Sequence, residues 1–311
     1  MIESQCVIAP PARTAVFLVG TIDPGGEATV RDLLEDVAGL LRSVGYRAPY
    51  AELSCVVGVG SHAWDRLFAG PRPRDLHPFV PLEGAGHRAP STPGDVLFHL
   101  RAHEMDLCFE LARVIAERLA GAVTMVDEVH GFKYFDERDL LGFVDGSENP
   151  GQQVAVDAVF VGAEDEPFRG GSYVIVQKYL HDLAAWNALT TQQQENAIGR
   201  SKLANIEMPD DVKPPDSHVA LNVITDMDGN EQKIVRENMP FGTIGKREFG
   251  TYFIGYARTP AVTERMLRNM FLGDRPGIHD RILDFSTAVT GSLFHVPSVK
   301  FLNDLPPSPS G

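Results

Sequence analysis

Of the 311 residues in this chain, 43% are hydrophobic and 23% are charged, which is the composition of a globular protein of about two domains. This composition excludes a wholly disordered chain and a collagen-like repeat, and no stretch reaches the ~20 consecutive apolar residues that span a bilayer. Because 28 Lys and Arg stand against 42 Asp and Glu, the net charge of −14 provides no basic footprint, and we expect neither nucleic acid nor membrane as a partner.

The first 135 residues predict the element order strand, helix, strand, strand, helix, strand. Apolar β-rich runs predict the strands, and apolar stripes at helical spacing that end in glycine predict the helices. In chain order we expect a strand at 14–22, a helix at 28–45, strands at 51–60 and 95–102, a helix at 104–121 and a strand at 122–135. Six prolines between Pro71 and Pro93 predict a loop that runs over the surface.

A similar order of elements follows residue 150. We expect a strand at 170–180, helical structure at 181–200, a strand at 250–260, a helix at 260–271 and a last strand within 286–298. The tail from Phe301 onward is rich in proline and serine and is expected not to pack. Two α+β units, each with helices on one face of an antiparallel sheet, fit this order best.

The start of the chain and its cysteines indicate the compartment. Glu3 precedes a short apolar run, and the first thirty residues lack the basic region and cleavage site of a signal peptide, so we expect a cytoplasmic protein. Cys6, Cys55 and Cys108 are odd in number and far apart, which fits neither a disulfide framework nor a metal knuckle. We therefore expect buried thiols in a reducing compartment.

The densest group of turn and polar residues is LGFVDGSENPG at 141–151. One interpretation is a plain turn between domains, because Asp-Gly and Asn-Pro pairs are strong turn signals. The other is a reactive site, because Asp145 directly follows the apolar Phe143 and Val144. An acid held against apolar neighbours suits proton transfer near neutrality. The residues alone leave both interpretations open.

The ten histidines contain no HExxH or CxxCH pattern, so the sequence supports neither a zincin site nor covalent haem attachment. His99 and His103 have the zincin spacing, but we expect His99 in a strand. Four residues of strand would separate the pair by roughly 13 Å, too far to share a metal ion. A single histidine can still be the axial ligand of haem iron, and no spacing pattern reveals such a site.

At 142–150 the chain resembles the dye-decolourising peroxidases, haem enzymes that reduce hydrogen peroxide and carry a GxxDG signature. Further segments resemble the family in the same order, and they are HGFKYFDERD, GGSYVIVQKY, QENAIGRSK, DSHVALN, IVRENMPFG, GTYFIGYAR and LDFSTAVTGSLF. The resemblance extends from about residue 14 to about residue 300, and the short loops are similar to the bacterial B-type subgroup. It implies two ferredoxin-like units of the dimeric α+β barrel-like superfamily, an N-terminal domain at 1–140 and a haem-binding domain at 141–311.

The resemblance also implies a site. His218 in DSHVALN matches the axial ligand of the iron in one non-covalent haem b per chain, and Asp284 matches the carboxylate that accepts the other ring N–H of that ligand. Asp145, Arg236 and Asn238 match the three residues that handle peroxide on the other face of the haem. The remaining residues that the resemblance assigns to haem binding are Arg200, near a propionate, together with Gly146 and Ser147.

The function that this resemblance implies is a peroxidase that oxidises dyes, phenols or other one-electron donors through a ferryl intermediate. Trp186, Trp64 or a surface tyrosine would carry electrons from large donors. The alternatives are a haem- or iron-handling protein with incidental peroxidase activity, and an interaction protein without cofactor in which 142–150 is a hinge. We expect a homo-oligomer, and an encapsulin shell as a partner would require a docking extension, whereas this sequence ends at PPSPSG.

Overall fold

The structure is a computed structural model that describes residues 3–309 of the chain, apart from 274 and 276. Its first half contains β1 (Thr14–Ile22), α1 (Glu27–Gly45), η1 (Pro49–Ala51), β2 (Ser54–Gly60), α2 (Ser61–Leu67), β3 (Leu82–Glu83), β4 (Arg88–Ala89), β5 (Val96–Ala102), α3 (Met105–Arg118), β6 (Val123–Phe132) and η2 (Phe135–Glu137), where η marks a 3₁₀ helix. Its second half contains α4 (Gln152–Val159), η3 (Ala163–Phe168), β7 (Ser172–His181), α5 (Leu183–Asn187), α6 (Thr191–Ile198), α7 (His218–Asn222), β8 (Ile224–Thr225), β9 (Glu231–Gln232), β10 (Val235–Arg236), β11 (Met239–Thr243), η4 (Ile244–Lys246), β12 (Glu248–Ala257), α8 (Pro260–Leu272), η5 (Arg281–Asp284), β13 (Ser286–Ala288), β14 (Ser292–Val296) and α9 (Val299–Asn303).

The long elements lie close to the ranges that the sequence predicts, and β1 matches its predicted range. Two predicted segments are divided. The segment 181–200 contains the separate helices α5 and α6, because Asp182 and Thr190 each cap a helix N-terminus with a side-chain oxygen. The segment 286–298 contains the strands β13 and β14, which pair with β7 on either side of a break in the ladder.

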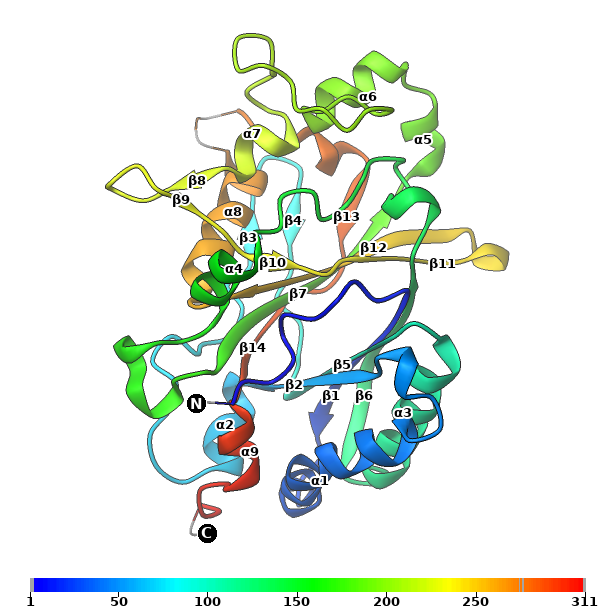
Figure 1. Ribbon diagram of the computed structural model, residues 1–311. Helices are drawn as coiled ribbons and strands as arrows, with labels where there is room; N and C mark the ends of the chain where they lie inside the picture. The colour runs from blue at the N-terminus through cyan, green and yellow to red at the C-terminus, as the bar shows by residue number, and fades with distance from the viewer. Residues whose placement is uncertain (1–2, 274, 276, 310–311) are drawn as a thin grey trace.

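The two halves repeat one strand order, although their sequences differ. Ten strands form a single antiparallel sheet in the order β10-β12-β7-β14-β2-β5-β1-β6, with β11 added beside β12 and β13 beside β7 (Figure 1). In each half, the second, third, first and fourth strands of the unit lie side by side in that order. This is the ferredoxin-like arrangement, and it confirms the predicted α+β fold. The path of described strands ends at β10 and β6, so the sheet does not close into a barrel.

The sheet has apolar residues on both faces, which explains why its strands read as nearly continuous hydrophobic runs. One face of the first half packs against α1 and α3, with Val16 and Leu18 of β1 in that core. The opposite face packs against the second half of the same sheet. There Phe17 stacks on Tyr252, with ring centroids 4.2 Å apart. The sheet therefore folds back on itself, and both halves share one core.

The junction between the halves is narrow. Strand β14 pairs with β2 through only two residue pairs, Phe294 with Gly60 and His295 with Val59. The buried side chain of Gln5 extends this junction. Its amide nitrogen donates to the carbonyl oxygens of Val57 at 2.9 Å and Pro297 at 2.8 Å, and its oxygen accepts from the Val57 N–H at 2.8 Å. The N-terminal segment thus links the two units of the sheet.

Two segments that the sequence predicts to lie loosely on the surface are packed. The proline-rich loop contains the hairpin β3–β4 and buries Leu76 and Phe79 in the core. In the tail, helix α9 buries Leu302, and the Pro307 carbonyl accepts the Ala69 N–H at 2.8 Å. Apolar side chains explain why both segments pack: Leu76 and Phe79 lie between prolines of the loop, and Leu302 precedes the prolines of the tail. The last two residues of the tail lie outside the described residues.

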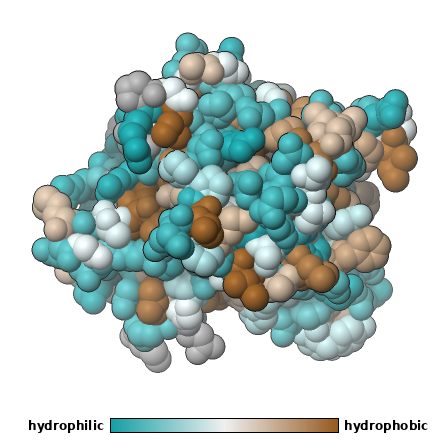
Figure 2. Space-filling view, turned by 90° about the horizontal axis from the view of Figure 1, so that it is seen from above, coloured by the Kyte–Doolittle hydropathy of each residue, from teal (hydrophilic) through white to brown (hydrophobic). Residues whose placement is uncertain are grey.

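The surface agrees with the acidic composition. Figure 2 shows a mainly hydrophilic face on which hydrophobic side chains are scattered rather than gathered in one area, as is ordinary for the surface of a folded protein. Among the described residues, no helix is both long and apolar enough to cross a bilayer.

We expect Gln5→Ala to lower the free energy of unfolding by about 2–4 kcal/mol, because the change leaves three buried backbone groups at the junction without their partner. Urea unfolding of both proteins measures this difference. The control is Gln192→Ala, which removes an exposed amide on α6 and should change stability by no more than about 0.5 kcal/mol. Equal effects of the two changes would contradict the role of Gln5.

Candidate functional site

The second half of the molecule surrounds a cavity of about 1,090 Å³, its open mouth included. The loop 141–148, strands β7, β10 and β12, and helices α7 and α8 all contribute side chains to its wall. Much of the lining is apolar, including Phe253, Met266 and Met270, and the polar groups converge from a few positions. A large apolar cavity with few polar groups is the usual form of a cofactor or substrate site.

The loop that contains Asp145 has a fixed shape. Gly142 and Gly146 adopt φ angles of +89° and +77°, in the left-handed region that favours glycine. A Cβ on Gly142 would also lie 2.6 Å from Cε of Lys202. The Arg138 guanidinium donates to the carbonyl oxygens of Gly142 at 2.8 Å and Lys202 at 2.6 Å, which fastens the loop to the next segment. The two glycines of the motif therefore allow the backbone conformation of this loop, which places Asp145 on the cavity wall.

Asp145 and Asn238 form a pair on the cavity wall. Oδ1 of Asp145 accepts from the Gly146 N–H at 2.7 Å and from Nδ2 of Asn238 at 3.2 Å. The amide oxygen of Asn238 accepts the Ile254 N–H of β12 at 3.1 Å, which fixes the direction of the amide. Oδ2 of Asp145 accepts no hydrogen bond from any described residue. One carboxylate oxygen is thus anchored and the other is left for a ligand or a proton.

Arg236 brings an unpaired cation to the same wall. Its backbone is held by Asn149, whose side chain accepts the Arg236 N–H at 2.9 Å and donates to the Arg236 carbonyl at 2.7 Å. The guanidinium makes no hydrogen bond or ion pair with a described residue, and its Nε is buried. Burial lowers the pKa of Arg236 from its usual value, against the effect of Asp145 and Glu148. A buried donor without a partner is costly, which indicates a place for an external acceptor.

His218 begins helix α7, which Ser217 caps, and lines the cavity. Its Nδ1 donates to Oδ2 of Asp280 at 2.7 Å, and the Asp280 side chain has no exposed surface. The other oxygen of Asp280 accepts the Ile282 N–H at 3.0 Å, so the carboxylate is held at both ends. This pairing puts the ring proton on Nδ1 and leaves the lone pair on Nε2, which makes no hydrogen bond to a described residue. His218 can therefore coordinate a metal ion through Nε2.

The predicted pairing of His218 with Asp284 is wrong. Asp284 is 41% exposed at the end of η5, outside the cavity lining, and contacts His279 and His87. Asp280, four residues earlier, is the partner. Both acids belong to the same turn of chain, but only Asp280 points into the interior, where a carboxylate needs donors.

The structure brings the other predicted site residues to one cavity. Asp145, Gly146, Ser147, Arg200, His218, Arg236 and Asn238 all line it. Arg200 already has partners, because it donates to Glu148 at 2.6 Å and to the side chain and carbonyl of Asn205 at 3.0 and 2.9 Å. Its role near a propionate stays a prediction.

Two titratable residues of the cavity wall were not predicted. Loss of solvent, with the nearby charge of Asp145, raises the pKa of Asp139 to about 7, although the carboxylate accepts the Phe143 N–H at 3.0 Å. Burial lowers the pKa of His181 to about 4, so this ring is neutral at pH 7. His181 bonds the hydroxyls of Ser286 at 2.8 Å and Thr251 at 2.9 Å. The sequence shows Asp139 as a second acid six residues before Asp145, but not its place in the cavity wall.

Several other polar or aromatic residues have structural roles. His99 lies in strand β5, as predicted, where it is buried against Tyr256 with an Nδ1–OH distance of 2.8 Å, while His103 pairs with Glu52. The two histidines thus have separate partners. Both tryptophans are buried, and Trp186 donates to the Leu141 carbonyl at 2.9 Å. The cysteines are free; two are buried as predicted, but Cys6 is exposed.

Comparison with known proteins identifies relatives along almost the whole chain. The family model for the N-terminal part of the Dyp-type peroxidases matches residues 4–133, and that for the C-terminal part matches residues 136–301. A dye-decolorizing peroxidase of Mycolicibacterium paratuberculosis is 62% identical over 309 residues, which are 99% of this chain and 87% of the relative.

Solved structures are similar over the same extent. The encapsulated DyP-type peroxidase from Mycobacterium smegmatis matches with a TM-score of 0.98 and 62% identity, over 99% of this chain and 100% of that one. A DypB variant from Rhodococcus jostii in complex with haem matches with a TM-score of 0.95 and 57% identity, over 97% of this chain and 98% of that one.

The raised pKa of Asp139 predicts a pH dependence of stability. Its folded value of about 7 lies above the ordinary value of ~3.9 for an unfolded chain, so its contribution to stability is present below pH ~4 and is lost as the pH rises toward 7. We expect Asp139→Asn to keep the hydrogen bond from the Phe143 N–H and to remove the decrease in stability between pH 4 and pH 7. At pH 8 the variant should be more stable than the parent protein, by up to ~4 kcal/mol, with no such gain at pH 4. Urea unfolding at several pH values tests this, and parallel pH curves would contradict it.

Proposed function

The chain belongs to the Dyp-type peroxidases, and we propose that it reduces hydrogen peroxide at a non-covalent haem b in the cavity and oxidises dyes, phenols or other one-electron donors. The observation that carries this proposal is the pairing of His218 with the buried Asp280 at the cavity wall. It directs Nδ1 to the acid and leaves Nε2 facing the cavity, which is what a haem iron requires from its protein ligand.

The residues of the cavity fit a haem. The wall is largely apolar, as the porphyrin faces require, and its volume of about 1,090 Å³, mouth included, leaves room for a large planar group. His218 would hold the iron, and Arg200, Gly146 and Ser147 would contact the edge of the group. The orphaned Nε of Arg236 is the further sign that the cavity holds a ligand with acceptor atoms. When bound, haem supplies the redox-active iron at which peroxide is reduced.

Asp145 is placed to move a proton. Peroxide reduction requires the proton on one oxygen to reach the other oxygen, which leaves as water. Oδ1 of Asp145 is anchored by Gly146 and Asn238, so the free Oδ2 can accept this proton and return it, directly or through a water molecule. Asn238 acts here as a positioning residue, because its amide donates to Asp145 and accepts the backbone N–H of Ile254.

Arg236 stabilises negative charge. Its guanidinium stays protonated at any working pH, so it cannot serve as a base. As the bond between the peroxide oxygens breaks, charge develops on the departing oxygen, and a fixed cation in a poorly solvated place stabilises it strongly. Asn149 holds the Arg236 backbone rather than its side chain. Since no described residue accepts from the guanidinium, its N–H donors remain for this task.

A second hollow supports a route for peroxide. It lies beside the first, and both are lined by Asp145, Gly146, Arg236 and Asn238. The N-terminal segment from Ile8 to Ala12 forms another part of its wall. A small molecule entering there would meet the acid and the cation first. The two tryptophans are buried, which supports packing as their first role and leaves electron transfer through them a proposal.

We further propose the setting in which the protein works. The chain comprises an N-terminal domain, 1–140, and a haem-binding domain, 141–311, and it acts as a homo-oligomer in the cytoplasm. The encapsulated relative from Mycobacterium smegmatis supports an encapsulin shell as a partner. The physiological partners of the site itself are hydrogen peroxide and small or dye-like reductants.

The purified protein should contain or take up one haem b per chain, and His218→Ala should lose the normal Soret band or bind haem far more weakly. An absorption spectrum and a haem titration measure both. Asp284→Asn is the matched control, since this acid lies outside the cavity and should leave the spectrum unchanged. A His218→Ala protein with the parent spectrum and affinity would show that the ligand assignment is wrong. Peroxide turnover compared with the rate of haem release separates a peroxidase from a haem-handling protein.

Arg236→Leu should slow peroxide reduction more than Asp145→Asn. The loss of one preorganised donor costs about 10²–10³ in rate, and no other cation lines the wall beside Arg236 except Arg200, whose donors are engaged with Glu148 and Asn205 among the described residues. An ordered water can replace a carboxylate in moving a proton. Stopped-flow mixing with peroxide, followed in the Soret region with haem content matched, ranks the variants. A slower Asp145→Asn protein from mildly acidic to neutral pH would reverse the assignment of the two roles.

A further inference from the structure

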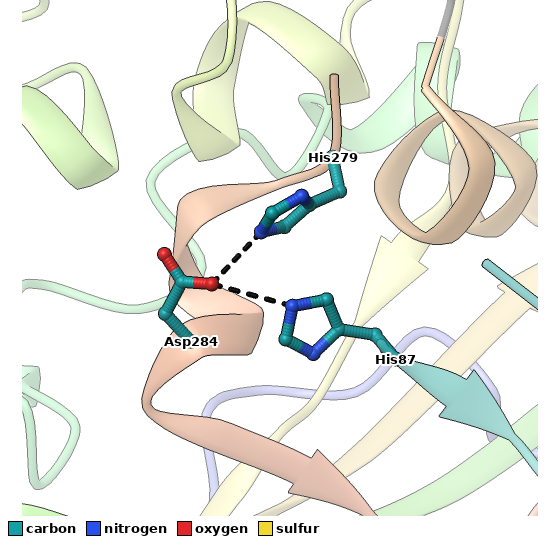
Figure 3. A group of neighbouring side chains, drawn as sticks. All are labelled: His87, His279 and Asp284. Carbon is teal, nitrogen blue, oxygen red and sulfur yellow. Dashed lines mark hydrogen bonds and ion pairs between the residues drawn. The ribbon is translucent and has the colours of Figure 1, made fainter. Parts of the chain in front are cut away.

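Three side chains that can bind a metal ion converge in Figure 3, and none of them is among the residues that line the cavity. His87 comes from the turn between β3 and β4, His279 from the segment after α8, and Asp284 from the end of η5. Nε2 of His279 lies 2.8 Å from Oδ1 of Asp284, and Nε2 of His87 lies 3.2 Å from the same oxygen. The three ligand atoms all lie within 4.8 Å of one another.

These distances fit the edges of a coordination polyhedron. Nitrogen and oxygen ligands lie ~2.0–2.2 Å from Zn²⁺, which places neighbouring ligand atoms ~3.0–3.5 Å apart. The two observed nitrogen–oxygen distances differ from that range by a few tenths of an ångström at most. The imidazole rings also face the same point, with centroids 4.4 Å apart and planes at 47°. An ion could enter between the three atoms with small side-chain movements.

Exposure supports binding from solution. The side chains of His87, His279 and Asp284 are 21%, 30% and 41% exposed, so an ion reaches them without any opening of the core. A site of three protein ligands leaves at least one coordination position for water. Unlike His218, whose Nδ1 is committed to a wholly buried acid, both histidines here direct a nitrogen to an exposed carboxylate.

We propose that His87, His279 and Asp284 form a binding site for a divalent transition metal ion of the zinc class, separate from the cavity. Two imidazoles and one carboxylate favour Zn²⁺, Ni²⁺ or Cu²⁺ over Mg²⁺ or Mn²⁺, which prefer sets of oxygen ligands. The site joins a hairpin of the first half to the segment that carries Asp280, the neighbour of His279 in the chain. A bound ion would therefore cross-link the halves beside the carboxylate that orients His218.

The experiment titrates the haem-loaded protein with Zn²⁺ by calorimetry in a buffer free of chelators and phosphate. We expect one Zn²⁺ per chain at this site. Loss of a residue that merely orients a ligand costs about 10–100-fold in metal affinity, so His87→Gln, His279→Gln and Asp284→Asn should each weaken binding by at least ~100-fold. Mn²⁺ should bind the parent protein more weakly than Zn²⁺.

The control is His103→Gln, which changes a histidine–carboxylate pair that has no third metal-binding side chain nearby among the described residues and should leave Zn²⁺ affinity unchanged. The Soret spectrum of each variant shows that the protein is folded and loaded. Cu²⁺ and pulsed EPR provide a second readout, because two bound imidazoles should give coupling to two nitrogens, reduced to one in His87→Gln.

Two outcomes would overturn the proposal. Equal Zn²⁺ affinity of the parent protein and the three site variants would place any binding elsewhere, and absence of binding would mean that the trio is only a hydrogen-bonded contact. A Cu²⁺ signal that does not change in His87→Gln would exclude this histidine as a ligand.

Discussion

A carboxylate with no exposed surface has to be paired, and in this molecule the pairing of Asp280 sets the chemistry of the cavity. One oxygen accepts the N–H of Ile282 and begins η5, while the other accepts Nδ1–H of His218. Since both ends of the carboxylate are fixed, the ring of His218 is fixed in tautomer and direction. A freely rotating imidazole could not hold Nε2 toward the cavity, so the direction of this ligand atom depends on the buried carboxylate.

Asp145 and Arg236 require a different arrangement, because both must keep their charge and stay available to a ligand. Contacts of the two asparagines Asn149 and Asn238 provide it. Asn149 binds the N–H and carbonyl of Arg236 and leaves its guanidinium free, and Asn238 occupies only one oxygen of Asp145. A direct ion pair between Asp145 and Arg236 would satisfy both groups and remove both from peroxide. Each asparagine contacts one of the charged residues, and the charge of Asp145 acts on Arg236. The effects of changing these residues should therefore not add, and double variants are needed to separate their contributions.

The sequence predicts the fold well where its signals are local. Continuous apolar runs locate strands such as 14–22. The break between α5 and α6 was not predicted, although its signal, the capping box of Thr190 and Gln193, is also local. Long-range pairs are different. Nothing near Gln5 in the sequence indicates that its amide will join β2 to the end of β14, since that partner is decided by the packing of the two halves. The resemblance to a family identified most of the predicted residues that line the cavity. It did not show that Asp280, rather than Asp284, is the buried acid.

The error at Asp284 shows what burial adds to residue type. The segment around η5 holds two histidine–aspartate pairs of the same composition, His218 with Asp280 and His279 with Asp284. In the first, the acid is wholly buried, so its charge is committed to one imidazole and the pair acts as a fixed support. In the second, the acid contacts a second histidine, His87, and because it is 41% exposed, solvent or an ion can reach the carboxylate. Asp280 thus orients the side chain of His218, whereas Asp284, four residues later, is placed to be a metal ligand itself.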